Sequence, residues 1–378
     1  MYDLIVIGAG PAGTSAAITA ARSGARVLLL ERGRFPRHKV CGEFVSAESL
    51  DLLAALLGSQ YAALQHDAIR IPRARLYLDG RVLETAVDPP AASIARLDLD
   101  AALWQSAKSA GVEARHQVTV QRIVRGPGAA PFRILTGGGE FEARALVNAS
   151  GRWSNLSATP AKNGGTREKW VGLKAHFAEP SPEASVDLYF FEGGYCGVQP
   201  VDINGENSNH KLPDRRLANH GRVNACAMVR PEVGSTLAEV FARHPALDER
   251  SRKWQPLSDP VSTAPLIFRD PQPERDGILM AGDAAGFIDP FVGDGISLAL
   301  RSGSLAGQCL MPFLVGEIPL HDAAHQYRQT YERRLAPVFR ASSRIRRMLV
   351  LPRVLRTPLL FLLENTPAIT RYVVSKTR

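Results

Sequence analysis

The chain has 378 residues, of which 45% are hydrophobic, so it can bury more than one core. Its net charge of +9 lies entirely beyond residue 330, where eleven Lys or Arg residues stand against two acidic ones. This uneven distribution excludes a broadly basic nucleic-acid-binding surface, and no nucleic-acid partner is expected.

The N-terminal segment predicts a βαβ unit. Residues 2–7 are a β-branched apolar run of strand length, and a G-x-G-x-x-G spacing follows at once from Gly8. Small and helix-tolerant residues come next, with Gly24 as the expected helix stop. Residues 26–31 then predict a second buried strand that ends in an acid.

Each residue of this motif has a separate structural or chemical role. Gly8 allows a tight turn, Gly10 lets the backbone approach a pyrophosphate, and Gly13 lets helix and strand pack closely. The helix N-terminus then faces the phosphate charge, and Glu31 can accept hydrogen bonds from ribose hydroxyls. The motif therefore predicts a dinucleotide site. The alternative is a tight strand-to-helix turn with Glu31 as a solvated strand end.

A basic connection interrupted by proline follows over residues 34–43 and leads to a helix predicted over residues 47–57. This connection could lie along a bound dinucleotide, although a solvated charged loop would have the same composition. Alternating residues on both sides of Asp79 and Gly80 predict a β-hairpin.

The next helix is predicted from Arg96 to about Ala110, with acidic residues at its N-terminal turn, the favourable end of the helix dipole. Two groups of strands follow, and a polar insert over residues 202–221 is expected to be a mobile loop. The strands are predicted over residues 118–124, 132–136, 141–147, 171–177, 186–191, 195–201 and 223–229.

After Pro260 the chain returns to an α/β pattern. Residues 277–281 predict a short buried strand, residues 282–294 a glycine-rich loop, and residues 295–315 an apolar helix. A second glycine-rich loop aimed at a helix N-terminus predicts a second cradle for a phosphate or a ring edge. A plain strand-to-helix connection is the alternative.

The cysteines and the apolar runs bear on localisation. The four cysteines are Cys41, Cys196, Cys226 and Cys309. Their spacing is neither that of metal ligands nor that of a disulfide framework, so we expect a reducing compartment and no metal site. No cleavable signal segment and no apolar run of transmembrane length is evident. We therefore expect a cytoplasmic protein, soluble or peripheral at the membrane.

Together these motifs resemble the flavoprotein superfamily of para-hydroxybenzoate-hydroxylase-type monooxygenases, flavin-dependent halogenases and geranylgeranyl reductases, over about residues 1–315. The first glycine motif is similar to the family's FAD adenosine site, and Arg96 with Asp100 to its Arg-x-x-x-Asp helix start near the pyrophosphate. Residues 282–290 resemble its G-D-A-A…D-P loop, whose aspartate bonds the flavin sugar chain. The resemblance implies FAD in preference to NAD.

One branch of the superfamily is indicated more closely. Residues 36–42 are similar to the P-x-x-K-x-C-G segment of the geranylgeranyl reductase branch, which places Cys41 beside the flavin. That branch's aromatic Y-x-W-x-F-P segment is matched only at Tyr195 and Pro200, with Gly197 and Val198 where bulk would shape the pocket. No W-x-W-x-I-P halogenase motif is present.

The electron donor is left open by the sequence. The family's D-G motif, linked to flavin and pyridine-nucleotide contacts, reads Ser150-Gly151, and no second G-x-G-x-x-G follows a strand. NADPH or another donor could therefore reduce the flavin.

The resemblance implies the following site. The residues expected to be catalytic are Cys41 and Tyr195. The residues expected to bind FAD are Gly8, Gly10, Pro11, Ala12, Gly13, Glu31, Arg32, Arg37, Lys39, Cys41, Gly42, Arg96, Asp100, Val118, Ser150, Gly151, Gly282, Asp283, Pro290, Gly293, Gly295 and Ile296.

The expected fold is α/β, with a Rossmann-like FAD-binding domain of the glutathione-reductase type, an antiparallel β substrate domain and a helical C-terminus. The FAD-binding domain is expected to be discontinuous, over residues 1–70, 97–160 and 270–315. The substrate domain is expected over residues 71–96 and 161–269, and basic helices over residues 316–378.

Three functions follow as hypotheses. The first is an FAD-dependent oxidoreductase that reduces or dehydrogenates a carbon–carbon double bond of a lipophilic, isoprenoid-like substrate. The second is an FAD-dependent monooxygenase that hydroxylates an aromatic or polyketide-like compound. The third is a non-catalytic FAD-binding protein.

From Arg340 onward, arginines alternate with short apolar stretches interrupted by prolines. Basic amphipathic helices of this kind suit an anionic membrane surface, which would also present a lipophilic substrate. The alternative is a terminal helical cap whose apolar face packs on the substrate domain with its arginines in water.

Overall fold

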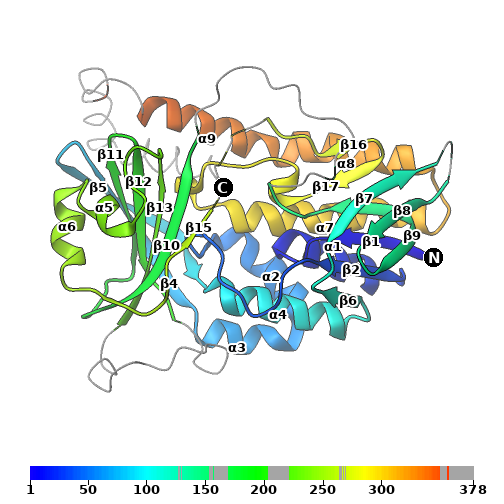
Figure 1. The fold of residues 1–378 in the computed structure, drawn as a ribbon, viewed down its shortest axis with the longest axis horizontal. Coiled ribbons are helices and arrows are strands. Elements are labelled where there is room, and N and C mark those ends of the chain that lie inside the picture. The colour runs from blue at the N-terminus through cyan, green and yellow to red at the C-terminus, as the bar shows by residue number, and fades with distance from the viewer. Residues whose placement is uncertain are drawn as a thin grey trace.

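The structure is a computed structural model that describes residues 1–126, 128, 130–152, 156, 169–202, 221–263, 266, 268, 270–349 and 356. It contains two sheets at opposite ends of an elongated molecule, connected by helices (Figure 1). The insert predicted over residues 202–221 lies outside the described residues except at its ends, as does the tail beyond residue 349 except Arg356.

The first sheet has eight strands and a parallel centre in the order β17-β9-β1-β2-β6. Its central strands carry almost unbroken apolar runs because helices or other strands cover both faces. The edge strand β16 and the meander β7-β8-β9 pair antiparallel. The strands are β1 (Tyr2–Ile7), β2 (Val27–Glu31), β6 (Glu113–His116), β7 (Val120–Arg125), β8 (Phe132–Thr136), β9 (Gly139–Asn148), β16 (Glu274–Arg275) and β17 (Ile278–Met280).

Two parallel helices pack against each other in the half of the molecule that contains the first sheet, called the cofactor half below. Helix α1 (Pro11–Arg22) packs along α7 (Gly295–Leu314) at very short range, because Gly303 and Gly307 have no side chain. A Cβ atom at Gly303 would overlap the carbonyl oxygen of Ala12. The N-termini of both helices therefore point to the same side of the sheet. Further helices cover this half: α2 (Leu50–Leu57), α3 (Tyr61–His66) and α4 (Arg96–Ser109).

The second sheet has nine strands in the order β14-β10-β13-β12-β11-β4-β5-β3, with β15 beside β10. Every pairing is antiparallel except β4 with β11, which is parallel because the chain leaves the sheet between them. The strands are β3 (Phe44–Val45), β4 (Ile69–Leu78), β5 (Arg81–Ser93), β10 (Val171–Glu179), β11 (Ser185–Phe191), β12 (Gly194–Pro200), β13 (Gly221–Val229), β14 (Gln255–Pro256) and β15 (Val261–Ser262).

Successive residues of a strand point to opposite faces, so this sheet has two different surfaces. One face packs under two short helices, α5 (Leu237–Phe241) and α6 (Pro245–Ser251), in a core that includes Val198 and Trp254. The other face is turned toward the cofactor half. Helix α5 begins with a capping box between Thr236 and Glu239.

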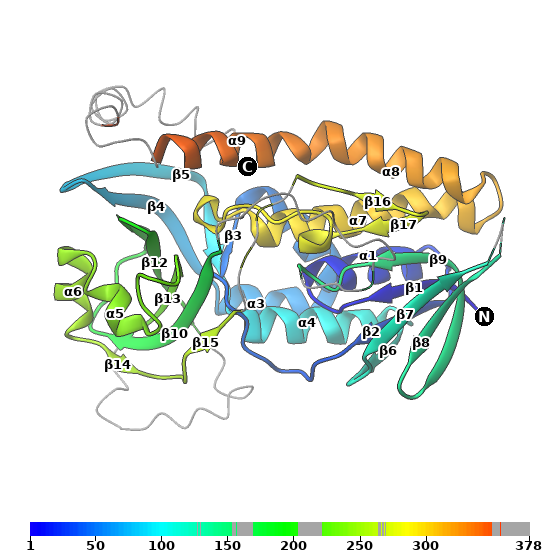
Figure 2. The ribbon, with the colours of Figure 1, turned by 45° about the horizontal axis from the view of Figure 1, so that its top comes forward.

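The C-terminal helices α8 (Leu320–Arg334) and α9 (Ala336–Leu349) run end to end along the molecule, from the first sheet toward the β4–β5 hairpin (Figure 2). The Tyr327 hydroxyl donates to the Met280 carbonyl oxygen at 2.7 Å, and Val338 and Phe339 are buried. The apolar sides of both helices therefore cover the core, as a cap would. Among the described residues, no helix is both long and apolar enough to cross a membrane.

Most predicted elements are confirmed, including the two-residue hairpin turn at Asp79 and Gly80. Polar or very short segments were missed, namely α3, α5, α6, β3, β6, β14, β15 and β16.

Candidate active site

The first glycine motif lies between β1 and α1, and its glycines meet different surroundings. Gly8 has a φ of +97°, and a side chain there or at Gly13 would overlap backbone carbonyl oxygens. Gly10 instead faces open space, where a Cβ atom would meet only Nη2 of Arg96 at 4.0 Å. The motif therefore leaves room directly in front of the first turn of α1.

This space is suited to an anion. Helix α1 has no side-chain cap and no acidic residue in its first turn, so its free amides and positive dipole end are uncompensated. Burial, together with the charges of Arg37 and Arg96, lowers the pKa of Lys39 to about 8. Three cations thus lie near one helix N-terminus, and within the described residues only Arg37 and Arg96 are paired with carboxylates, so the pyrophosphate of FAD would balance the remaining positive charge. The residues present fit the cofactor.

Glu31 ends β2 and lies at the edge of the same space. Its carboxylate accepts from the amides of Ala9 at 2.9 Å and Gly33 at 2.6 Å, and pairs with both terminal nitrogens of Arg37 at 2.6 and 3.0 Å. Burial would raise the pKa of Glu31, but Arg37 and the two amides lower it to about 2. A ribose hydroxyl would therefore have to share this carboxylate with Arg37.

The space in front of α1, bordered by Gly8, Gly10, Gly13 and Glu31, is called the cradle below. Arg96 lies between this cradle and Cys41. Its guanidinium makes two 2.8 Å hydrogen bonds to the buried carboxylate of Asp100 and also interacts with Cys41. Burial alone would lower the pKa of Arg96, but Asp100 and Cys41 raise it above its ordinary value. The sulfur of Cys41 also accepts from the amide of Glu43 at 3.3 Å. The thiol is thus placed beside a fixed positive charge.

The second glycine-rich loop leads into α7. Gly282 and Gly293 have φ values of +61° and +78°, and a side chain would lie 2.9 Å from Ala12 and Phe44 respectively. Asp283 is 3.5 Å from Arg152 in an ion pair. The loop therefore packs closely against α1 at Gly282 and against β3 at Gly293.

Two aspartates of this loop are buried carboxyl groups. Asp289 accepts from the Tyr195 hydroxyl at 3.3 Å and from the Phe291 amide at 3.4 Å, and Asp294 accepts from the Ser46 hydroxyl at 2.8 Å. Burial raises the pKa of each aspartate to about 6, although these hydrogen bonds oppose the shift. Asp294 was not among the predicted site residues.

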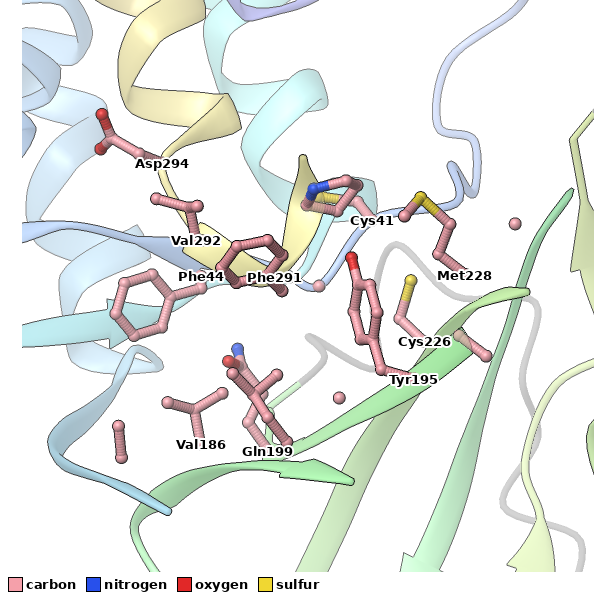
Figure 3. A pocket seen from close by; sticks show the side chains of 18 of the residues that line it. Cys41, Phe44, Val186, Tyr195, Gln199, Cys226, Met228, Phe291, Val292 and Asp294 are labelled. Carbon is pink, nitrogen blue, oxygen red and sulfur yellow. The ribbon is translucent and has the colours of Figure 1, made fainter. Parts of the chain in front are cut away.

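Between the two halves lies an apolar cavity of about 220 Å³ (Figure 3). Tyr195 stands in it with its ring 6.1 Å from that of Phe291, edge to face. The cofactor half contributes Val40, Cys41, Gly42, Pro290, Gly293 and Asp294, and the second sheet contributes Phe44, Leu76, Leu188, Tyr195, Gly197, Cys226 and Met228. The C-terminal helix α9 adds Ile345.

Strand register explains which residues of the second sheet face the cavity. Gly197 lies opposite Cys226, and Tyr195 lies opposite Met228, so these residues share one face. Val198 points the other way and is buried in the core under α5 and α6. The expectation that Val198 shapes the pocket is therefore wrong, because adjacent strand residues alternate between faces.

A charged cluster that was not predicted lies behind Cys41. Glu43 is fully buried, and its carboxylate contacts the amine of Lys174 and Nε2 of His176, the latter at 2.8 Å. Burial would raise the pKa of Glu43, but Lys174 and His176 hold it well below its usual range. Only the spacing of two basic residues in an otherwise apolar strand hints at this cluster in the sequence.

The predicted site residues therefore fall into groups. Around the N-terminus of α1 lie Gly8, Gly10, Pro11, Ala12, Gly13, Glu31, Arg37, Lys39, Arg96 and Asp100. Along the cavity lie Cys41, Gly42, Tyr195, Pro290 and Gly293, with Gly295 and Ile296 in the first turn of α7 and Gly282 and Asp283 before it.

The surroundings of the other four predicted residues differ, and the Cα atom of Ser150 lies directly against Gly8 of the first glycine motif. Arg32 is exposed, and Val118 only donates its amide to the Glu31 carbonyl oxygen at 2.9 Å. The Ser150 hydroxyl donates to the side chain of Asn148 at 2.6 Å, and Gly151 turns the chain with a φ of +83°. Within the described residues, no cluster of His, Cys, Asp or Glu is arranged to hold a metal ion.

The family model described as "FAD binding domain" matches residues 1–342. Digeranylgeranylglycerophospholipid reductase 2 of Methanopyrus kandleri is 27% identical over 327 residues, which cover 81% of this chain and 76% of the relative. Menaquinone reductase of Mycobacterium tuberculosis is 27% identical over an alignment of 385 positions, which spans 94% of this chain and 86% of the relative.

Solved structures show the same fold. A geranylgeranyl bacteriochlorophyll reductase-like protein from Thermoplasma acidophilum has a TM-score of 0.74 at 20% identity, over 100% of this chain and 95% of that one. A flavin-dependent brominase has a TM-score of 0.76 at 19% identity, over 100% of this chain and 93% of that one. The resemblance noted in the sequence is confirmed. The chain belongs to the FAD binding domain family and is an FAD-dependent oxidoreductase.

Proposed function

We propose that this oxidoreductase reduces or dehydrogenates a carbon–carbon double bond in a lipophilic, isoprenoid-like substrate. The observation that carries the proposal is the apolar cavity, which Cys41 borders on the cofactor side and the second sheet on the other. At about 220 Å³ it exceeds the ~150 Å³ apolar cavity that holds a benzene ring. The names of the relatives agree, since they include reductases of digeranylgeranyl lipids and of menaquinone.

FAD, when bound, supplies the hydride chemistry, and the protein supplies the surroundings. The apolar walls bind hydrocarbon and exclude water, which strengthens the electrostatic interactions inside the cavity. Cys41 is one group on the cofactor side that can hold or give a proton, with its sulfur oriented by the Glu43 amide and the Arg96 guanidinium. The buried Asp294 carboxyl is another. Tyr195, hydrogen-bonded to buried Asp289, is a further proton-bearing group at the cavity.

The test is single-turnover reoxidation of the reduced flavoprotein by a polyprenyl lipid or a prenylated quinone under anaerobic conditions. We expect wild type to transfer its reducing equivalents and Cys41→Ser to do so at least about tenfold more slowly with FAD still bound. Cys309→Ser is the matched control, because Cys309 lies on α7 away from the cavity lining. Equal rates in wild type and Cys41→Ser would remove the thiol from the reaction.

A monooxygenase is the second candidate. It is favoured by Gly197, which leaves the cavity wall open where the reductase branch carries aromatic bulk. Mixing the reduced protein with oxygen distinguishes the two, because a long-lived flavin hydroperoxide absorbance would indicate hydroxylation. We expect simple reoxidation. NADPH and reduced ferredoxin, added separately to the oxidised protein, would identify the electron donor.

The basic C-terminal helix also fits an anionic membrane surface. Arg340, Arg344 and Arg347 are exposed along one side of α9, while Ile345, on the same helix, lines the cavity. A helix with these two sides would bring an anionic lipid surface close to the cavity.

Vesicle flotation tests the proposal that α9 binds an anionic membrane surface. Changing Arg340, Arg344 and Arg347 to Gln should weaken binding to phosphatidylserine vesicles about 100-fold, because each basic residue near the surface contributes about 1 kcal/mol. The matched control removes three exposed arginines elsewhere, Arg115, Arg133 and Arg252. Binding that is absent in wild type at low salt, or equally reduced in both variants, would leave α9 as a cap only.

A further inference from the structure

The segment from Cys41 to Glu43 is held against the second sheet at several points. The Asn224 side chain donates to the Cys41 carbonyl oxygen at 3.0 Å, and the Glu43 carboxylate contacts Lys174 and His176. In the antiparallel register His176 lies opposite Asn224 on the neighbouring strand, so the contacts come from one small area of the sheet. Cys226, which lies opposite Lys174 in the same register, lines the cavity, so this area is next to it.

Glu43 also ties this area to the cofactor half. Its Oε1 accepts from the Arg96 amide at 2.8 Å, at the start of α4, and its own amide donates to the Cys41 sulfur at 3.3 Å. Glu43 thus contacts the start of α4, the thiol of Cys41 and strand β10 of the second sheet. The partners of Glu43 all surround it only when the cofactor half and the second sheet are packed together.

The conformation of Glu43 is unfavourable by itself. It has a φ of +64°, in the left-handed region that favours glycine, and it is buried without exposure. A buried carboxylate is tolerated only when it is paired, and an apolar replacement of such a cluster is often no less stable. Strain and buried charge at one residue beside a cavity are typical of a functional position rather than of a stabilising one.

We propose that Glu43, Lys174 and His176 form a positioning cluster that fixes the Cys41 thiol at the wall of the cavity. Lys174 and His176 hold the carboxylate, and the carboxylate holds the turn that presents the sulfur to the cavity. The inference rests on the proposed function only for the importance of Cys41, because the position of the thiol can be measured without a substrate.

The test is alkylation of the FAD-loaded protein with iodoacetamide, followed by mass spectrometry of the peptide that contains Cys41. We expect Glu43→Gln to raise the alkylation rate of Cys41 at least about tenfold, because the freed turn opens locally. Cys309 serves as an internal reference, because it lies on α7 away from the cavity lining and from the Glu43 cluster.

Glu179→Gln is the matched control. Glu179 lies on the same strand, β10, and its carboxylate pairs with Arg250 at 2.6 and 2.8 Å, but it contacts no residue of the Cys41 segment. Both variants break a largely buried ion pair and should lower the melting temperature. Only Glu43→Gln should change the alkylation of Cys41, and equal Cys41 rates in the two variants would overturn the proposal.

A second variant covers the case in which Glu43→Gln does not fold. Glu43→Gln combined with Lys174→Met removes both charges at similar volume, which is often tolerated. Faster Cys41 alkylation in this folded, FAD-loaded double variant supports positioning, and the wild-type rate overturns it. If neither variant folds, the cluster is a structural requirement and the positioning role fails. Faster Cys41 alkylation with unchanged turnover would count against the proposed role of Cys41 in the reaction and leave the positioning cluster standing.

Discussion

The cradle before α1 and the wall of the cavity differ in which atoms form them. The cradle is made of main chain between β1 and α1, with Glu31 and three cations added at its rim. The cavity wall is made of side chains from the Cys41 loop, the loop before α7, strands of the second sheet and α9. The first is local in sequence, and the second exists only after long-range assembly.

This difference separates two kinds of binding. A cradle of amides and glycines recognises a phosphate charge that every FAD molecule carries, so its sequence pattern can be short. A cavity wall recognises the shape of one hydrocarbon. A change of one side chain can therefore alter which substrate binds without altering the cradle. The predictions below separate these two regions, starting with the largest effect.

Gly13→Ala should abolish FAD binding and destabilise the protein by more than about 3 kcal/mol, because the new methyl group overlaps the Gly8 carbonyl oxygen. Gly24→Ala is the matched control, since a methyl group there meets nothing within 4 Å and adds only the strain of a φ of +92°. FAD content and urea unfolding measure both effects. Retention of FAD by Gly13→Ala would mean that α1 and β1 can separate at little cost.

The same contrast explains what the sequence predicts. The cradle was predicted because Gly8, Gly10, Gly13 and Glu31 lie at fixed spacings with direct steric and hydrogen-bonding roles. Periodicity also located the strands of the second sheet, although not the parallel pairing of β4 with β11, which depends on where the chain returns.

The cavity was predicted only in part. Cys41 and Tyr195 came from the resemblance, whereas Glu43 and its partner Lys174 are 131 positions apart and carry no shared pattern. Val198 was misplaced although alternation along the predicted strand already puts it on the face opposite Tyr195 and Gly197.

Glu31→Gln should lower the free energy of unfolding by about 3 kcal/mol at pH 7, since the folded-state pKa of about 2 lies below the ordinary value of 4.5. A depressed carboxyl pKa stabilises the fold above pH 4.5, and this contribution is lost as the pH falls toward 2. Urea unfolding at pH 7, 5 and 3 should therefore show a difference between wild type and variant that shrinks with acidity. A constant difference would mean that the charge of Glu31 is not what stabilises the cradle.

Asp294→Asn should have the opposite sign. Burial raises the pKa of Asp294 from 3.8 to about 6, so wild type loses stability as the pH rises between these values and the carboxyl must ionise in place. The neutral variant should be more stable by up to about 3 kcal/mol above pH 6 and equal to wild type near pH 4, because the shift is about two pKa units at about 1.4 kcal/mol each. Thermal unfolding of FAD-free and FAD-saturated protein at both pH values checks this. A variant that is less stable at pH 7 would show that Asp294 is ionised and paired.

The smallest expected change in stability is also the most specific for the cavity. Gly197→Ala places a methyl group 3.3 Å from Cδ2 of Leu188 and 3.7 Å from the Cys226 carbonyl oxygen, in a strand where Ala is slightly preferred over Gly. The free energy of unfolding should therefore stay within about 1 kcal/mol of wild type.

The methyl group of Gly197→Ala nevertheless takes space from the cavity, so KM for a bulky prenyl substrate should rise several-fold while FAD binding is unchanged. Val198→Ala reverses this result, because Val198 lies on the other face: it should cost about 2 kcal/mol of stability and leave KM unaffected. The variants Gly197→Ala and Val198→Ala thus test the two faces of one strand separately. If Val198→Ala changed KM while Gly197→Ala did not, the substrate would bind on the α5 and α6 side of the sheet, and the cavity described here would not be the substrate site.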